Sequence, residues 1–291
     1  MLNQTVTHFA STTADLLGAL PAPPSDSIGP FRLYGLMIAL GVIAAVVIAQ
    51  RRWSAWGGEE DTIVAVAVWA VPAGLIGARL YHVLTDWGTL YDDGRWTNAF
   101  KIWQGGLGIP GGLLAGVVTG VVLARRRGLP AAQLLDVVAP AIPLAQAIGR
   151  LGNWFNQELF GRPTDLPWGL RIDAAHRPDG YERFATFHPT FIYEALWNLA
   201  LAGLLVLYER RRPDARPGTL FALYVGGYGL GRLWVEALRI DDATRLAGVR
   251  VNIWVSLLAI TASTVTLAVL HHRQRRAARP TNDDEPHLAA S

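Results

Sequence analysis

Two arginines stand in or beside apolar stretches, each with polar side chains at helical spacing. Arg150 is followed by Asn153 and Gln157, at i, i+3 and i+7, which is one face of a helix if the helix continues. Asn156 and Glu158 flank that face. A forked guanidinium beside neutral donors is suited to a phosphate diester. An Arg–Glu pair that only orders the neighbouring segment explains the same spacing equally well.

The second arginine, Arg232, lies between Tyr228 and Glu236 at i, i+4 and i+8, so the three share nearly one helical face. The glycines of the same turns are Gly226, Gly227, Gly229 and Gly231. Glycines let helices approach closely, and they also leave space for a bound headgroup. Glu236 either positions the guanidinium or pairs with it structurally. Two such arginines on different apolar segments predict a clamp for an anionic lipid headgroup.

Two further charges fall inside apolar stretches. For Arg79, extension of the side chain toward lipid headgroups and a functional role are equally good interpretations. For Asp136, we expect a structural role, either as a helix cap or as the partner of an arginine.

The elements that carry these residues are long and apolar. A membrane-spanning helix needs about 20 mostly apolar residues. Seven stretches meet or approach this length: 31–50, 62–84, 106–124, 133–149, 189–208, 219–238 and 252–271. The fourth is the least regular because Asp136, Pro140 and Pro143 interrupt it. We therefore predict an all-α integral membrane protein, a bundle of about seven transmembrane helices with a small extracytoplasmic head domain.

The composition supports a membrane protein and excludes several kinds of chemistry. Of 291 residues, 51% are hydrophobic and only 17% are charged, against about 25% charged in soluble domains. The absence of cysteine excludes disulfides, zinc–thiolate sites and a cysteine nucleophile. Any thiol in the reaction must therefore belong to a substrate. The basic residues lie between apolar runs instead of on one soluble face, which argues against nucleic-acid binding.

The distribution of arginines predicts an orientation. Tight clusters follow alternate apolar stretches, at 51–52, 125–127, 210–216 and 273–279. By the positive-inside rule these are cytoplasmic, which places the N-terminus outside and the C-terminus inside the cell.

Four non-spanning parts complete the predicted organisation. We expect a transmembrane catalytic domain over 1–272 with its head insert at about 151–188, and a polar cytoplasmic tail over 273–291. The segment 85–104 is polar and aromatic, as expected at a membrane interface. The N-terminus lacks the features of a signal peptide, so we expect it to be retained.

Five segments of the sequence resemble the prolipoprotein diacylglyceryl transferases. GRLGNWFNQELFG at 149–161 is similar to that family's signature. The other similar segments are YGLM at 34–37, Asp136 with Ala139, Pro140 and Pro143, HPTFIYE at 188–194, and GYGLGRLWVEALR at 227–239. A single Arg–x–x–Asn pattern would be weak, but five segments in order on a seven-span frame are specific.

The resemblance implies a bacterial enzyme of the plasma membrane that moves diacylglycerol from phosphatidylglycerol to the lipobox cysteine of a prolipoprotein. A thioether forms and glycerol phosphate leaves, which is the first step of lipoprotein maturation. The implied partners are phosphatidylglycerol, prolipoproteins and membrane lipids, and no metal or cofactor is implied. By position, Arg150 and Arg232 bind the phosphate and stabilise the leaving charge. The residues implied to shape this lipid site are Tyr34, Asn153, Asn156, Glu158, Gly161, Tyr228 and Glu236.

The chain departs from the family pattern in the third apolar stretch. Many relatives carry a histidine before the double glycine there, whereas this chain has Pro110, which cannot accept a proton. Three alternatives for activating the thiol remain open: His188 as base, Glu158 as base, or a thiol pKa lowered by the arginines without a dedicated base. We favour the third.

Two other classes of membrane protein compete with this interpretation. A lipid-binding or transport protein without transferase activity would also carry buried charges and glycine-rich helices, but we find no internal repeat. An intramembrane protease needs a serine–histidine pair, an aspartate dyad or a metal-binding motif, and the sequence has none. A transferase releases glycerol phosphate only when an acceptor cysteine is present, and this separates the first two classes.

Overall fold

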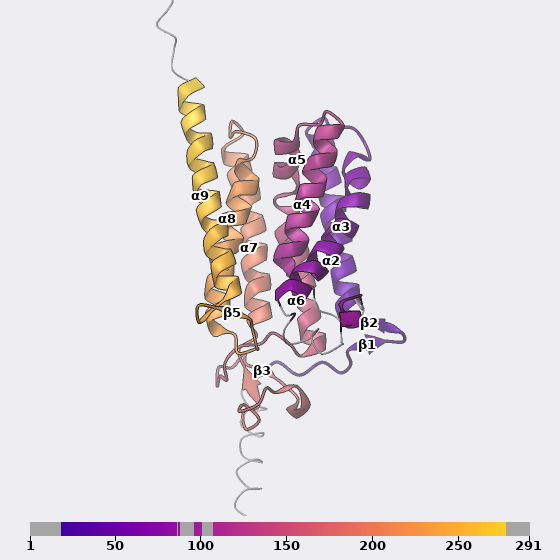
Figure 1. Ribbon diagram of the computed structural model, residues 1–291, viewed down its shortest axis with the longest axis vertical. Coiled ribbons are helices and arrows are strands. Elements are labelled where there is room, and N and C mark those ends of the chain that lie inside the picture. Colours follow the sequence, from indigo (N-terminus) through magenta and orange to yellow (C-terminus); the bar gives the residue numbers. More distant parts are fainter. Residues whose placement is uncertain (1–18, 86, 88–95, 101–106, 278–291) are drawn as a thin grey trace, which may run out of the picture.

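The computed structural model describes residues 19–85, 87, 96–100 and 107–277 as a bundle of long helices (Figure 1). Successive long helices run in alternating directions between the two ends of the bundle. The helices are α2 (Leu33–Ala55), α3 (Thr62–Thr85), α4 (Ile109–Arg126), α5 (Ala131–Val138), α6 (Ala141–Asn156), α7 (Thr190–Arg211), α8 (Thr219–Leu238) and α9 (Val251–Ala277). Two short 3-10 helices, η2 (Trp96–Phe100) and η4 (Ala174–His176), lie between them.

The strands are short and form three antiparallel pairs at one end of the bundle. They are β1 (Ser27–Ile28) with β2 (Phe31–Arg32), β3 (Leu170–Arg171) with β4 (Thr186–Phe187), and β5 (Arg245–Leu246) with β6 (Val249–Arg250). Each pair joins or orders the chain between helices, so the protein is all-α in its architecture, as predicted.

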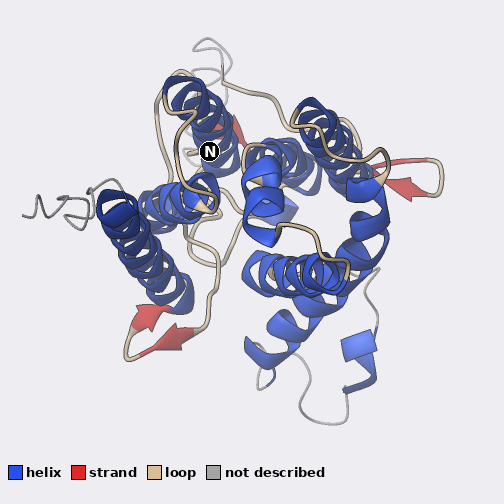
Figure 2. Ribbon diagram, turned by 90° about the horizontal axis from the view of Figure 1, so that it is seen from above, coloured by secondary structure: helices blue, strands red, loops and turns tan. Residues whose placement is uncertain are grey.

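The helices pack in sequence-distant pairs as well as neighbouring ones. Seen from the end of the bundle, α2 lies against α6 and α3 against α4, while α7, α8 and α9 follow one another (Figure 2). Small residues make the close contacts possible. A Cβ on Gly41 of α2 would lie 2.7 Å from the carbonyl oxygen of Ala145 on α6. Such close backbone approach is typical of helices packed within a membrane.

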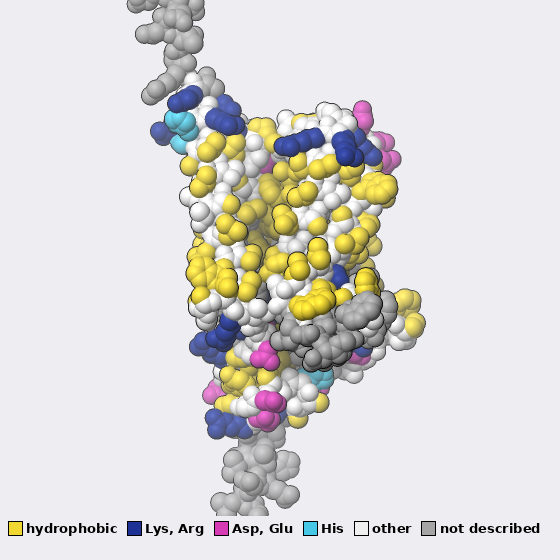
Figure 3. Space-filling model, in the orientation of Figure 1, with side chains coloured by type: hydrophobic (Ala, Val, Ile, Leu, Met, Phe, Trp, Pro, Cys, Tyr) yellow, Lys and Arg dark blue, Asp and Glu magenta, His cyan; other side chains and the backbone are white. Residues whose placement is uncertain are grey.

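Among the described residues, six helical segments are long and apolar enough to cross a membrane: α2, α3, α4, the continuous stretch 131–156 that contains α5 and α6, α7 and α9. The surface shows a broad apolar band with basic side chains beyond both of its edges (Figure 3). The helix α8 has 20 residues and packs between α7 and α9. Its glycines, Arg232 and Glu236 make it less apolar, and a seventh crossing by α8 stays a prediction.

The fourth apolar stretch is bent and longer than expected. The helix α5 ends at Val138 and α6 begins at Ala141. Pro140 explains the break, because it has no N–H group and its ring would clash with the carbonyl four residues earlier. The helix then continues to Asn156, past the predicted end at 149. The first residues of the predicted head insert are therefore helical, and the outer boundary of that insert stays a prediction.

Residues 157–189, called here the cap segment, extend beyond the ends of α6 and α7 (Figure 1). They carry β3 and β4 and have a small core of their own. Its buried side chains are Phe160, Leu170, Ile172 and Phe187, and they pack with Phe191 of α7. The chain before β1 is attached to this segment, because Leu20 forms a parallel bridge with Leu170.

The arginine clusters gather at the end of the bundle opposite the cap segment. The helices α2, α4, α7 and α9 all end there, which brings together the clusters that the sequence places after alternate spans. Most of the predicted interface segment 85–104, the N-terminal residues 1–18 and the tail residues 278–291 lie outside the described residues.

Candidate functional site

Arg150 lies in the last two turns of α6 and pairs with a carboxylate on α7. Its Nη2 atom is 2.6 Å from Oε1 of Glu194, and Nη1 is 3.4 Å from Oδ1 of Asn153. Both charged side chains are buried, with 8% of Arg150 and 3% of Glu194 exposed. The partner of Arg150 is therefore Glu194, the fifth residue of α7, and not Glu158, which follows α6 in the chain.

Glu194 also binds the second predicted arginine. Its Oε2 atom is 3.2 Å from Nη1 of Arg232 on α8, and the hydroxyl of Tyr228 donates to Oε1 over 3.5 Å. One carboxylate thus joins α6, α7 and α8. The two guanidinium groups therefore share one carboxylate in a site largely removed from water.

Glu236 supports Arg232 from the next turn of α8. Its Oε2 atom is 2.7 Å from Nη2 of Arg232, the contact that the spacing predicts. The other oxygen, Oε1, is 2.5 Å from Nε of Arg250 in β6, and the Asn252 amide donates to the same carboxylate. Ion pairs with Arg232 and Arg250 therefore hold Glu236, which in turn orients Arg232.

The network continues outside the spans to Asp241. This carboxylate is 2.6 Å from Nε of Arg239 and 3.1 Å from Nη2 of Arg250. Burial alone raises the pKa of Asp241, but hydrogen bonds and charge from Arg239, together with the charge of Arg250, bring it below its ordinary value. Asp241 is therefore ionised at neutral pH and fixes the chain between α8 and α9.

A strained turn ends α6 and places Glu158. Gln157 has a φ of 48° and Leu159 one of 56°, in the left-handed region that non-glycine residues rarely adopt. Between them, Glu158 accepts hydrogen bonds from the amides of Asn153 (2.8 Å) and Asn156 (3.1 Å). The turn thereby keeps a carboxylate beside Arg150, at a conformational cost of about 1–2 kcal/mol for each residue.

The prediction that Gln157 shares a helical face with Arg150 and Asn153 is wrong. The helix ends at Asn156, and the amide of Gln157 turns away to bind Asp173 of the cap segment. It donates to Oδ2 of Asp173 over 2.6 Å and accepts from the backbone N–H of Asp173 over 2.8 Å. Gln157 thus orders the cap segment, while Arg150 and Asn153 stay on α6.

A polar cavity of about 400 Å³ opens beside these charges. The predicted site residues in its lining are Tyr34, Arg150, Glu158, Tyr228 and Arg232. Asn153, Asn156 and Glu236 are not in the lining but contact side chains that are. The lining also contains Arg239, Tyr81, His82, Asp241 and Asp242. Arginines and phenols around a partly apolar cavity can bind an anionic headgroup that carries hydroxyls.

Two further features shape this cavity. Gly152 lets the ring of Tyr34 lie against α6, because a Cβ there would be 2.8 Å from Cδ2 of Tyr34. Pro110 is the second residue of α4, where a missing N–H is tolerated, and it lines the cavity. The position at which many relatives have a histidine therefore faces the site, with no atom that can take a proton.

His188 and Gly161 lie outside the cavity lining. Nδ1 of His188 is 3.1 Å from the hydroxyl of Tyr193, and burial together with the charge of Arg162 lowers the pKa of the imidazole. The N–H of Gly161 donates to the carbonyl of His188. A Cβ on Gly161 would be 2.8 Å from Thr190, so glycine is required for this close packing.

The glycines around Arg232 serve helix packing. A Cβ on Gly226 would be 2.5 Å from Oγ of Ser263 on α9, and one on Gly227 would be 2.5 Å from Leu201 on α7. A Cβ on Gly231 would meet the indole of Trp197. Neighbouring side chains fill these positions, and of the four glycines only Gly229 lines the cavity.

The other two charges have structural contacts. Asp136 accepts hydrogen bonds from the N–H groups of Gly218 (2.7 Å) and Phe221 (2.9 Å), so it caps the start of α8, as the structural interpretation predicted. Arg79 donates to the carbonyl oxygens of Asn98 (2.5 Å) and Ala99 (2.8 Å) and is 8% exposed. Its side chain anchors η2, and both sequence-based interpretations of Arg79 stay predictions.

The sequence interpretation missed Glu194, Arg250 and Asp241. Glu194 carried the same signal as Arg150, a charge inside an apolar stretch, and that rule alone would have marked it. Arg250 and Asp241 had no comparable signal, because they lie in a polar connection whose fold brings them to Glu236.

Known proteins with similar sequences agree with the family suggested by these residues. The model of the prolipoprotein diacylglyceryl transferase family matches residues 26–269. The phosphatidylglycerol–prolipoprotein diacylglyceryl transferase of Rhodococcus jostii is 48% identical over 272 residues, covering 88% of this chain and 76% of the relative. The enzymes of the same name from Streptomyces griseus (47% over 259 residues, 87% and 78% covered) and Cutibacterium acnes (46% over 260 residues, 88% of each) are similarly close. The chain therefore belongs to the prolipoprotein diacylglyceryl transferase family.

Proposed function

We propose that this protein transfers the diacylglyceryl group of phosphatidylglycerol to the lipobox cysteine of a prolipoprotein. The cysteine sulfur attacks the glycerol carbon that carries the phosphate ester and forms an S–C bond. The C–O bond to the phosphate breaks, and its electron pair leaves with glycerol phosphate. The thiol proton is released on the way to the thioether.

The observation that carries this proposal is the convergence of Arg150 and Arg232 on one buried carboxylate beside the polar cavity. Both guanidinium groups bind the phosphate and stabilise the negative charge that grows on the leaving oxygen. Glu194 and Glu236 hold the two arginines in place before the lipid binds. Preorganised charge is effective here because little water reaches the site to compete.

Tyr34 and Tyr228 hydrogen-bond the headgroup from the cavity lining, while Asn153 and Asn156 hold Glu158. Pro110 supplies no base, so the field of the two arginines lowers the pKa of the incoming thiol. Glu158 is an alternative acceptor, since it lines the cavity. His188 is a weaker alternative, because its imidazole is bonded to Tyr193 outside the lining.

The same proposal places the site toward the outer face of the bacterial plasma membrane. The end of the bundle with the clustered arginines lies in the cytoplasm, by the positive-inside rule. The cap segment, the polar cavity and the N-terminus then lie on the outer side, where a secreted precursor presents its cysteine. With α8 as a seventh span, the C-terminus is cytoplasmic.

The test is the transfer of labelled diacylglycerol from phosphatidylglycerol to a lipobox peptide by the purified protein. We expect the wild-type protein to modify the cysteine and release glycerol phosphate, and Arg150→Ala to do neither. A peptide with serine in place of cysteine is the matched control. If the wild-type protein binds phosphatidylglycerol but transfers nothing to a competent peptide, a lipid-binding or transport function replaces this proposal.

A further inference from the structure

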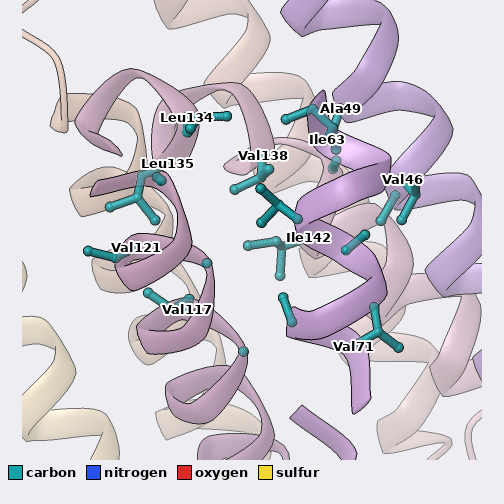
Figure 4. Close-up of a pocket in the computed structure, with 18 of the residues that line it drawn as sticks. Val46, Ala49, Ile63, Val71, Val117, Val121, Leu134, Leu135, Val138 and Ile142 are labelled. Carbon is teal, nitrogen blue, oxygen red and sulfur yellow. The ribbon is translucent and has the colours of Figure 1, made fainter. Parts of the chain in front are cut away.

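A second cavity lies inside the bundle and has a different character. It measures about 250 Å³ and is lined by apolar side chains and glycines of α2, α3, α4, α5 and α6 (Figure 4). In the close-up, Val71 of α3, Val117 and Val121 of α4, Val138 of α5 and Ile142 of α6 surround the space. A cavity lined only by such groups does not hold water well and favours an apolar ligand.

The apolar cavity follows the polar one along the same helices. On α4, Pro110 lines the polar cavity and Gly112 the apolar one, so the two begin within one turn of each other. On α6, Arg150 and Ile142 are about 12 Å apart along the axis at 1.5 Å per residue. The helices α2 and α3 also contribute to both. A molecule that spans the two cavities must therefore have an anionic head and an apolar tail.

The far end of the apolar cavity is closed. Its lining residues Ala49, Ile63, Ala124 and Leu134 belong to a packed cluster that also contains Trp53. From Gly112 to Ala124 the cavity follows α4 for about 18 Å at 1.5 Å per residue, more than half of a hydrocarbon core about 30 Å thick. Closure at this depth limits the length of any chain that enters it.

We propose that the apolar cavity binds one acyl chain of the phospholipid donor and selects donors by the length of that chain. This inference rests on the proposed function, because it takes the phosphate at Arg150 and Arg232 to be that of the same lipid. The chain enters beside Pro110 and passes along Leu113, Val117 and Val121 of α4, whose side chains line the cavity. Its last carbons meet the cluster around Ala124.

Two adjacent valines on α4 provide a matched test. Val117 lines the apolar cavity, whereas Val118 is 51% exposed on the outer surface of the bundle. Val117→Phe and Val118→Phe add the same ring to one helix, the first toward the cavity and the second on the exposed side. The readout is kcat/KM for transfer from phosphatidylglycerols with two eight-carbon chains and with two sixteen-carbon chains, presented in the same detergent.

We expect Val117→Phe to lower kcat/KM about tenfold or more for the long-chain lipid and to leave the short-chain value within about twofold, since pocket volume discriminates by individual methylenes. Val118→Phe should change neither value. Val121→Ala, which enlarges the cavity without adding bulk, should shift the preference toward longer chains. It keeps the test valid if Val117→Phe fails to fold.

The outcomes separate the two proposals. If the wild-type protein transfers from neither lipid, the proposed function and this inference both fail. If it transfers from both, but Val117→Phe and Val121→Ala leave the ratio of long-chain to short-chain kcat/KM unchanged, only the acyl-chain site is wrong. An equal loss for both lipids would indicate damaged packing, or a resident lipid that is not the substrate, and would also overturn this inference.

Discussion

Both ends of this bundle contain buried charges, but they bind different kinds of partner. At the end with the arginine clusters, Arg52 forms two hydrogen bonds to Glu209, of 2.9 and 3.0 Å, and a third to the carbonyl oxygen of Val137. The carboxylate of Asp136 accepts two backbone N–H groups at the start of α8. Here the charges bind one another and the backbone, and they tie helix ends together.

At the cap end the charged side chains surround a cavity, and not all of their hydrogen-bond donors have a partner among the described residues. Arg150 and Arg232 share Glu194, and the Nε atom of Arg150 is buried without a protein partner in the described part of the chain. A buried donor with no partner costs about 1–3 kcal/mol, which a ligand can recover. The comparison of the two ends indicates that a buried charge marks a binding site only when it keeps hydrogen-bonding capacity beside a cavity.

The largest expected effect comes from exchanging arginine for lysine at the two ends. Arg150→Lys keeps the charge but loses the fork, and we expect kcat/KM for transfer to fall by about 100-fold or more. Arg52→Lys breaks a comparable fork at the other end, and it should leave kcat/KM within about threefold while lowering thermal stability. Equal losses of activity in the two variants would remove the distinction between the ends.

Glu194→Gln should have the next largest effect. The amide keeps the shape but removes the negative charge that Arg150 and Arg232 share, so the two cations repel and lose their alignment. We expect about a 10- to 100-fold loss, mainly in kcat, because the two arginines still attract the phosphate but no longer hold the alignment that stabilises the transition state.

Glu194→Asp is the matched control, since it keeps the charge and shortens the side chain. Partial recovery of kcat relative to Glu194→Gln would identify the charge as the positioning element. If the loss instead falls on KM alone, Glu194 acts on lipid affinity, and its proposed role in alignment is wrong.

Asp136→Asn should lower stability more than activity. The neutral side chain keeps one acceptor for the N-terminus of α8 but loses its charge, and loss of such a cap costs about 1–2 kcal/mol. We expect a lower Tm in detergent and an unchanged kcat for the folded fraction. Loss of kcat without a change in Tm would place Asp136 with the functional site.

The smallest effect should come from His188→Gln. Burial and the charge of Arg162 lower the pKa of His188, so this imidazole is neutral near pH 7 and does not line the cavity. We expect an unchanged dependence of kcat/KM on pH between about pH 5.5 and pH 8. Disappearance of an acidic limb of the profile in the variant would identify His188 as the base after all.

Protonation of His188 also determines how the stability of the folded protein changes with pH. Because its pKa is lower in the folded protein, the unfolded chain takes up the proton first, and stability falls as the pH drops below the unfolded pKa. The substitution His188→Gln removes this loss of stability at low pH. The decrease in Tm between about pH 7 and pH 5 should therefore be smaller in the variant.

Much of the architecture follows from local chemistry and could be predicted. Apolar length identified the helices, because a chain in lipid must satisfy its backbone hydrogen bonds within each segment. Arg150, Arg232 and Glu236 were recognisable because charges in apolar stretches are costly. Pro140 predicted an irregular helix. The extension of α6 to Asn156 could not be predicted, because the turn at Gln157 ends the helix and no sequence pattern indicates its positive φ.

Contacts between distant segments could not be obtained in this way. The sequence showed only that Glu158 lies near Arg150 along the chain, whereas the packing of α6 on α7 made Glu194, 44 positions away, its partner. Contacts between other elements determined that Asp136 caps α8 and that Arg250 reaches Glu236. The residue types set which charges need partners, since an unpaired charge in an apolar interior is too costly. The close packing of the helices decided which partner each one has, because an ion pair depends on distances that only the assembled bundle defines.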